Sequence, residues 1–189
     1  NGVAKGVVDL ACHDLAARQV GRPVHDLIGG AVVDRIPLCG LLPLLDPETT
    51  AELAAGYQRG GYRSVRIKLG TSPTADRDVI AAVRARCGDD LRIRVDYNQA
   101  YTAPTAVRAL SLIEPFGIDA AEQPLPLGDL VGMVELQRRT PIPVFLHEGF
   151  FQLSELTTAI ELGAIGALGV NAERPGGVTA ALRAIDYAS

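Results

Sequence analysis

The amino-acid sequence predicts an α/β protein of the (β/α) barrel class, the TIM-type barrel. Three observations support this prediction: six short apolar segments alternate with six helical segments, the connections are short, and acids follow three of the apolar segments. Such alternation is typical of parallel strands joined by helices. The rival fold, a doubly wound sheet, normally carries a G-x-G-x-x-G turn after an early strand, and the sequence contains none.

The expected elements divide the chain into two parts. Residues 1–35 form a helical lead-in, with an amphipathic helix over residues 3–20 and a short helical turn over residues 23–30 that two glycines close. Residues 36–189 form six barrel units. Their strands are expected at residues 36–42, 64–70, 91–96, 118–122, 143–148 and 167–171, and their helices at residues 46–59, 73–87, 103–114, 129–139, 154–161 and 178–187.

Local signals support these boundaries. Asp46 followed by Pro47 is a strong helix start, because an acid caps the first turn and proline suits the first helical position. Pro37 weakens the first strand, since proline cannot donate a backbone hydrogen bond. In the second strand Arg66 and Lys68 alternate with apolar residues and therefore share one face.

Six units cannot close an eight-stranded barrel. The remaining strands lie either beyond residue 189 or elsewhere. We expect about two further units beyond Ser189, by the eight-fold count of the barrel, and a capping domain before Asn1. Residues 1–189 are thus expected to be part of a longer protein and, produced alone, to be poorly soluble or loosely packed.

Composition limits the partners. With 48% hydrophobic and 21% charged residues, the chain has the makeup of a soluble globular protein. A net charge of −4 with scattered basic residues argues against nucleic-acid or membrane partners, and no apolar run is long enough to span a membrane. Three cysteines without a close-spaced pair fit a cytoplasmic protein. We expect a small-molecule substrate and a homo-oligomer.

Three acids stand out by position. Asp96, Glu122 and Glu148 each follow an apolar segment at equal intervals, 122 − 96 = 26 and 148 − 122 = 26. Because strand ends meet at one face of a barrel, these acids are expected to converge. Oxygen ligands suit Mg²⁺, with Mn²⁺ as an alternative. The competing interpretation is that each acid caps a helix or is simply solvated.

Lys68 precedes the Asp96 strand, with Arg66 on the same face. An arginine and a divalent cation beside a lysine disfavour its ammonium form, which lowers the lysine pKa towards the range of a general base. The competing interpretation is that both residues are solvated charges at a strand end.

Arg66-x-Lys68, Asp96-x-Asn98, Glu122-Gln123-Pro124, His147-Glu148 and Gly176-Gly177 resemble the barrel domain of the enolase superfamily, most closely the mandelate racemase and muconate lactonizing enzyme branch. The resemblance covers essentially the whole chain. It implies Mg²⁺ bound by Asp96, Glu122 and Glu148, a substrate carboxylate held on the metal, and removal of the α-proton by Lys68 to form an enediolate. It also implies that a capping domain sets specificity.

Three residues depart from the family pattern. Arg66 replaces a lysine and stays protonated. Asn171 stands where muconate-type members carry a lysine and racemase-type members an aspartate, and an amide cannot do acid/base work. His147 stands where many relatives have an aspartate, so His147 is a second candidate for the third metal ligand, although oxygen preference favours Glu148. Asn98, Gln123, His147 and Asn171 are expected to contact substrate or support the ligands.

These departures favour one reaction type. Without an acid/base group opposite Lys68, a two-base racemase or epimerase is disfavoured and one-base chemistry stays open. Glu122 followed by Gln123, rather than by a second acid, favours a muconate-cycloisomerase-like isomerase or lyase. The alternatives are a sugar-acid dehydratase of the mandelate racemase type and a catalytically silent metal-binding scaffold.

Overall fold

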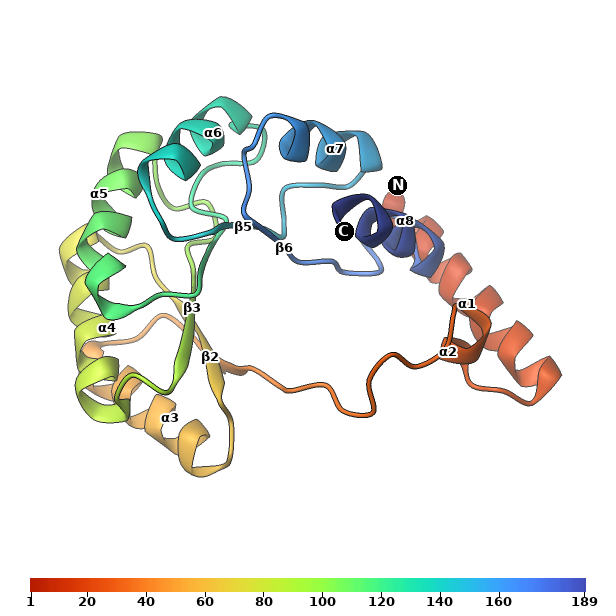
Figure 1. Cartoon of the computed structure of the whole chain (residues 1–189), viewed down its shortest axis with the longest axis horizontal. Coiled ribbons are helices and arrows are strands. Elements are labelled where there is room, and N and C mark those ends of the chain that lie inside the picture. The colour runs from red at the N-terminus through yellow and green to blue at the C-terminus, as the bar shows by residue number, and fades with distance from the viewer.

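The computed structural model describes residues 1–189 and contains one six-stranded parallel sheet. The strands are hydrogen-bonded in chain order from β1 to β6. They lie on the inner side of an arc of helices (Figure 1). Their bounds are β1 Gly40–Leu42, β2 Ser64–Lys68, β3 Arg92–Asp96, β4 Ala120–Glu122, β5 Val144–Leu146 and β6 Ala167–Leu168.

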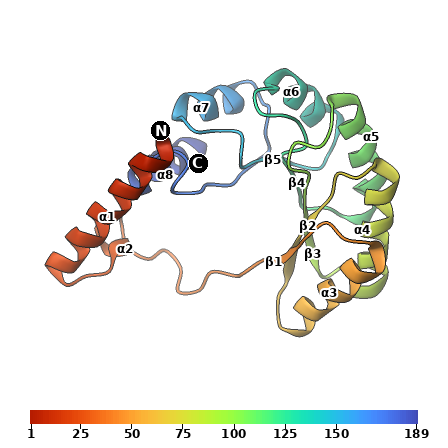
Figure 2. The same ribbon diagram turned by 180° about the vertical axis from the view of Figure 1, so that it is seen from behind.

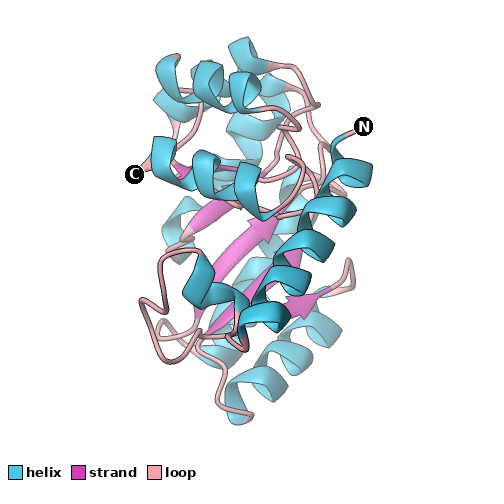
Figure 3. Cartoon of the chain, turned by 90° about the vertical axis from the view of Figure 1, so that its right-hand side faces the viewer, coloured by secondary structure: helices cyan, strands magenta, loops and turns pink.

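Helices α3 to α7 form this arc, as the views from the front and from behind agree (Figures 1 and 2). Each connects two consecutive strands, which is the arrangement of repeated βα units. A view from the side shows the strands surrounded by helices (Figure 3). The bounds are α3 Pro47–Arg59, α4 Pro73–Cys87, α5 Ala103–Ile113, the 3₁₀ turn η1 Glu114–Phe116, α6 Leu130–Arg139 and α7 Leu153–Glu161.

The strands bury one face against these helices. Along β2, Val65 and Ile67 are fully buried while Arg66 and Lys68 are half-buried on the other face. The same alternation places Ile93 and Val95 of β3 in the core. This core of aliphatic residues holds the strands in place, and the opposite face of the strands carries the polar side chains that could take part in a reaction.

The amino-terminal segment lies beside the last helix. It comprises α1 (Gly2–Val20) and α2 (Val24–Leu27), and α1 lies against the start of α8 (Val178–Ala188). There the Asp9 carboxylate accepts hydrogen bonds from the Thr179 hydroxyl at 2.8 Å and from the Thr179 backbone N–H at 3.3 Å. The predicted helix is confirmed, but its larger apolar side chains are not buried: Val7 and Leu15 are 62% and 57% exposed.

All six predicted strands extend beyond the observed ones, and the first and the last show why. The first begins at Gly40 rather than residue 36, and Pro37, which lacks an N–H, lies outside it. The last ends at Leu168, so Asn171 follows the strand. The sheet is open, because β1 and β6 do not pair with each other, and the closed barrel stays a prediction. None of the helices combines the length and the apolar character that crossing a membrane requires.

Candidate active site

The carboxyl ends of β2, β3 and β4 bring three charged side chains to one level. Lys68 pairs in register with Asp96, and Asp96 pairs with Glu122. Side chains directly opposite on neighbouring strands point the same way. Asp96 and Glu122 are each only 1% exposed, so two of the three predicted acids lie side by side in a buried position.

Cationic side chains surround these two acids. Arg66 Nη1 lies 3.5 Å from Asp96 Oδ2 and 3.4 Å from Glu122 Oε1, and Lys68 Nζ lies 3.5 Å from Asp96 Oδ2. Burial and the neighbouring Glu122 carboxylate raise the pKa of Asp96. Burial also acts to raise the pKa of Glu122, but a hydrogen bond from His147 and the charge of Arg66 hold it below its usual value.

Glu148 lies at a different level from the other two acids. Glu122 pairs with Phe145 across β4 and β5, an offset of 145 − 122 = 23 instead of the 26 between β3 and β4. Glu148 is therefore three residues beyond the matching position. No three acid, imidazole or thiol side chains come close enough together to hold a metal ion. The equal spacing of the acids in the sequence thus does not make all three converge, and Glu148 as a ligand stays a prediction.

The Glu148 carboxylate is held by two amides. Asn98 Nδ2 donates to its Oε1, and Gln99 Nε2 donates to its Oε2 at 2.9 Å. Asn98 also accepts a hydrogen bond from Lys68 Nζ through Oδ1, and its backbone N–H donates to Asp96 Oδ1 at 3.0 Å. Asn98 therefore joins the proposed base to both Asp96 and Glu148.

His147 adjoins the acid pair. Its Nδ1 lies 2.6 Å from Glu122 Oε1, and this hydrogen bond raises the pKa of His147 above its usual value. The Asn171 side chain acts in the same direction from the loop after β6. Arg174 Nη1 donates to the His147 backbone carbonyl at 3.2 Å. The predicted residue His147 thus lies against Glu122, and the Asn171 side chain acts on its ring.

Gln123 is a buried polar residue, 2% exposed, directly after β4. Its Nε2 donates to the Leu125 carbonyl at 3.0 Å, whereas its Oε1 has no hydrogen-bond partner. Gln123 has a φ of 38°, and Asn98 and Gln99 have φ of 43° and 69°. Left-handed conformations are uncommon for glutamine and cluster at functional sites. These three residues mark the strand ends as a constrained region.

Sequence reasoning missed Arg94 and Gln99. Arg94 Nε lies 3.4 Å from Glu122 Oε2 without a hydrogen bond, and its guanidinium lies 4.8 Å from the centre of the Phe145 ring. Gln99 accepts a hydrogen bond from the Leu127 backbone N–H at 3.0 Å while it holds Glu148. Two features of the sequence could have indicated these residues. Arg94 lies two positions before Asp96 in the same strand, so both side chains share one face, and Gln99 directly follows Asn98.

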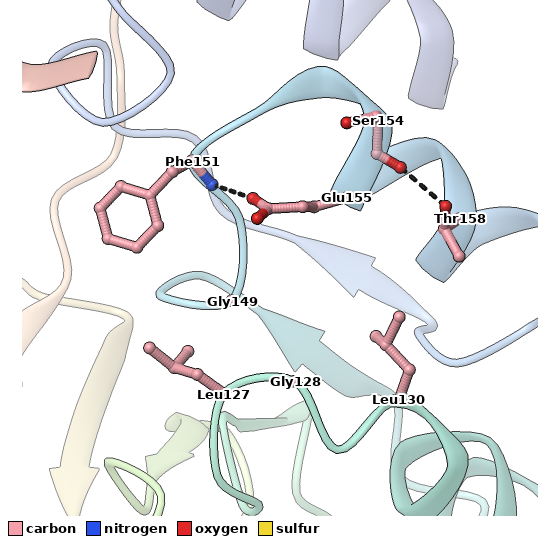
Figure 4. Close-up of a pocket in the computed structure, with 8 residues that line it drawn as sticks. All are labelled: Leu127, Gly128, Leu130, Gly149, Phe151, Ser154, Glu155 and Thr158. Atoms are coloured by element: carbon pink, nitrogen blue, oxygen red, sulfur yellow. Dashed lines mark hydrogen bonds between the residues drawn. The ribbon is translucent and has the colours of Figure 1, made fainter. Parts of the chain in front are cut away.

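A pocket of about 510 Å³ opens beside this region, between the loop after β4 and the start of α7 (Figure 4). It contains none of the charged residues described above. Inside it the Glu155 carboxylate accepts hydrogen bonds from the backbone N–H groups of Phe151 and Gln152, at 2.6 and 3.0 Å. The pocket is lined by Leu127, Gly128, Leu130, Gly149, Phe151, Ser154, Glu155 and Thr158.

The acid pair suits a hard divalent cation. Glu122 Oε2 is buried without a hydrogen bond, and although Arg94 Nε lies 3.4 Å from it, the oxygen keeps its capacity to accept a ligand bond from a cation. Asp96 beside it supplies further carboxylate oxygens, which Mg²⁺ prefers. Asp96 and Glu122 therefore fit as two of the ligands.

A parallel βα sheet with buried carboxylates and a lysine at its carboxyl edge defines an enzyme-type site. Residues 49–189 match the family described as enolase C-terminal domain-like. The chain belongs to the enolase superfamily, in its mandelate racemase and muconate lactonizing enzyme branch.

Known relatives cover several activities. The chain is 34% identical to an N-succinyl-L-Arg/Lys racemase of Bacillus cereus over 95% of this chain and 49% of the relative. It is 34% identical to a chloromuconate cycloisomerase of Pseudomonas putida over 86% of this chain and 44% of the relative. The crystal structure of a dipeptide epimerase from Cytophaga hutchinsonii, complexed with Mg and the dipeptide D-Ala-L-Val, is 26% identical with a TM-score of 0.93, covering 97% of this chain and 50% of that one. The chain thus spans about half the length of the curated relatives it matches.

Proposed function

We propose that this chain forms the proton-transfer part of an enzyme that removes the proton α to a carboxylate, in a one-base, muconate-cycloisomerase-like reaction. The observation that carries the proposal is the placement of Lys68 level with the buried pair Asp96 and Glu122. When bound there, a divalent cation, Mg²⁺ by analogy with the relatives, would hold the substrate carboxylate and stabilise the charge that develops.

Lys68 acts as the base. Asp96 and Asn98 hold its Nζ at the strand end, and after proton removal the same two groups stabilise the ammonium that forms. Arg66 stays protonated and orients the two carboxylates without exchanging a proton. Geometry and charge together therefore support Lys68 as the group that transfers the proton.

At the strand end opposite Lys68, no second lysine is present. Asn171 follows β6, where its amide cannot exchange protons at neutral pH. A proton removed by Lys68 then returns from the same face. Exchange through Lys68 alone therefore leaves the configuration of a stereogenic α-carbon unchanged, whereas a racemisation needs a second base on the opposite face.

Exchange of the α-proton in deuterated solvent tests this proposal. The full-length protein would be loaded with Mg²⁺ and offered N-succinylamino acids, dipeptides and muconate-type lactones, the substrate classes that the relatives' names suggest. We expect deuterium incorporation with retained configuration for one class, and its loss in Lys68→Ala. The only other lysine, Lys5 on the exposed side of α1, supplies the matched control Lys5→Ala, which should keep the wild-type rate.

Three results would contradict the proposal. Exchange in Lys68→Ala at the wild-type rate would place the base elsewhere. Racemisation would require a second base. Metal binding without exchange of any substrate class would favour the catalytically silent scaffold.

The proposal also covers the closure of the barrel and the assembly of the whole protein into an oligomer. We propose that further strands outside residues 1–189 pair with β1 and β6, that a capping domain covers the carboxyl edge, and that the whole protein is a homo-oligomer in the cytoplasm. The two unpaired edges of the sheet support the first of these points.

A further inference from the structure

The pocket beside the acid pair lies at the same end of the sheet as Lys68. Leu127 and Gly128 belong to the loop after β4, and Gly149 and Phe151 belong to the loop after β5, so this part of the wall follows the carboxyl ends of two strands. The start of α7 forms the opposite wall (Figure 4). Ligands of parallel βα folds bind at this end of the strands. The pocket is therefore placed to receive part of a substrate that reacts at Lys68.

A continuous chain of hydrogen bonds connects Lys68 with the wall of the pocket. Lys68 Nζ donates to the side-chain oxygen of Asn98, and the Asn98 amide donates to Glu148. Glu148 directly precedes Gly149, which lines the pocket. A single amide side chain therefore separates the proposed base from the residue that leads into the pocket.

Gln99 holds two sides of the pocket together. Its Nε2 donates to Glu148 Oε2 at 2.9 Å, and its Oε1 accepts from the Leu127 backbone N–H at 3.0 Å. Glu148 belongs to the loop after β5 and Leu127 to the loop after β4, and Gln99 itself follows β3. The position of the wall is thus fixed by the loop that also carries Asn98.

The lining of the pocket suits an uncharged, apolar group. Leu127 and Phe151 are each 46% exposed, so their apolar surfaces would lose contact with water when such a group binds. Glu155 is the one ionisable residue of the wall, and its Oε2 already accepts hydrogen bonds from the backbone N–H groups of Phe151 and Gln152. A ligand carboxylate would meet this like charge, and the wall contains no arginine, lysine or histidine to pair with it.

We propose that this cavity is a specificity pocket, which receives an uncharged apolar substituent of the carboxylate substrate. The inference rests on the proposed function, since it names the substrate class of the same site: a carboxylate that carries an aliphatic or aromatic group of several carbon atoms. The volume of about 510 Å³ lies within the range of roughly 300–1,000 Å³ that is typical of small-molecule sites.

Binding of unreactive carboxylates to the full-length protein with Mg²⁺ tests the inference without measuring turnover. Calorimetry would compare butanoate, octanoate, suberate and ω-aminooctanoate, which share a carboxylate but differ in the length of the chain and the charge at its far end. Octanoate should bind at least about tenfold more tightly than butanoate, a factor that the burial of two methylene groups supplies. Suberate and ω-aminooctanoate should lack this advantage, because each would carry a charge into the pocket.

Two substitutions on α7 localise the effect. Ser154 and Thr158 are exposed and line the pocket, so Ser154→Leu and Thr158→Leu should each fill it and remove the advantage of octanoate while the affinity for butanoate stays unchanged. Thr157→Leu is the matched control, since Thr157 and Thr158 both donate to the Ser154 carbonyl, at 3.0 and 2.8 Å, but only Thr158 lines the pocket. Two filling variants keep the test decisive if one of them fails to fold.

The outcomes separate this inference from the proposed function. Equal affinities of the wild type for octanoate and butanoate, or an advantage of octanoate that both filling variants keep, would overturn the specificity pocket and leave the proposed function intact. Tighter binding of suberate or ω-aminooctanoate than of octanoate would overturn it too, because the pocket would then take a charged group. An advantage that both filling variants abolish, without exchange of the α-proton in any substrate class, would support the pocket and overturn the proposed function.

Discussion

The phenolic hydroxyl of Tyr101 donates a 2.5 Å hydrogen bond to Oδ2 of Asp76, and both side chains are buried under the strand ends. The other oxygen, Oδ1, accepts from the backbone N–H groups of Gly70 and Thr71, at 3.0 and 3.3 Å. These two residues belong to the loop that begins directly after Lys68. The pair therefore ties the loop after β2, which follows Lys68, to the loop after β3, which follows Asp96.

Tyr101→Phe is expected to destabilise the protein by about 1–3 kcal/mol, because a buried carboxylate loses a donor. Urea unfolding measures the change. Tyr187→Phe is the matched control: it also removes a bond from tyrosine to a carboxylate, to Glu161 at 2.9 Å, but at an exposed position. If the free energy of unfolding falls no more in Tyr101→Phe than in Tyr187→Phe, Tyr101 does not anchor the two loops.

Asp76 also predicts a pH dependence of stability. Burial raises its pKa above the usual 3.8, and the hydrogen bonds from Tyr101, Gly70 and Thr71 offset this only in part. A carboxyl whose pKa is higher in the folded than in the unfolded state contributes stability that is complete below 3.8 and is lost as pH rises through the folded value.

The free energy of unfolding of the wild type, relative to Asp76→Asn, should therefore increase as pH falls through the raised pKa. Urea titrations at several pH values below 7 would measure the difference. A relative stability that decreases on acidification would mean that the hydrogen bonds outweigh burial.

Much of this framework could be predicted from the sequence, because it depends on local signals. Asp46 caps α3 through a 3.0 Å bond to the Thr49 N–H, as the acid before Pro47 predicts. The register of β4 and β5 could not be predicted, because it depends on how the loop before β5 packs. That register separates Glu148 from Asp96 and Glu122, which the equal spacing in the sequence had suggested would converge.

The roles of two further residues, Arg94 and Gln99, were also hard to predict from the sequence. The two-residue spacing between Arg94 and Asp96 predicts only that both side chains lie on one face of the strand. The contact of Arg94 with Glu122 forms only when the neighbouring strand β4 pairs with β3. Gln99 acts through two loops that come together only in the folded chain. Local patterns therefore indicate where side chains emerge, and the tertiary fold decides what they contact.

Two glycines are expected to respond to alanine in opposite directions. Gly70 has a φ of 120°, and an added Cβ would lie 2.6 Å from the Ala100 Cβ, so Gly70→Ala should destabilise the protein by roughly 1–3 kcal/mol. Gly56 lies within α3, and its nearest neighbour to an added Cβ is an arginine side chain 3.9 Å away. Gly56→Ala should stabilise by about 0.5–1 kcal/mol. Thermal unfolding of both variants checks the prediction, and equal shifts would refute it.

Removing one carboxylate oxygen from the acid pair should weaken cation binding. Glu122→Gln keeps the size of a fully buried side chain but loses its charge, so divalent-cation affinity should fall by at least about tenfold. Glu135→Gln on α6 is the control, since Glu135 forms only a surface pair with Arg139. Titration calorimetry of the full-length protein measures both, and equal affinities would exclude Glu122 as a ligand.

The open sheet predicts how residues 1–189 behave when produced alone. β1 and β6 each have one unpaired edge, and edges of parallel, apolar strands are prone to aggregation. The exposed apolar residues of α1 and of the segment before β1, among them Val32 at 94% and Ile36 at 78%, add to this tendency. Isolated residues 1–189 should therefore unfold with low cooperativity and bind a dye for apolar surface, whereas the full-length protein should do neither. A sharp unfolding transition of the isolated segment, with no dye binding, would mean that the six units are complete without further strands.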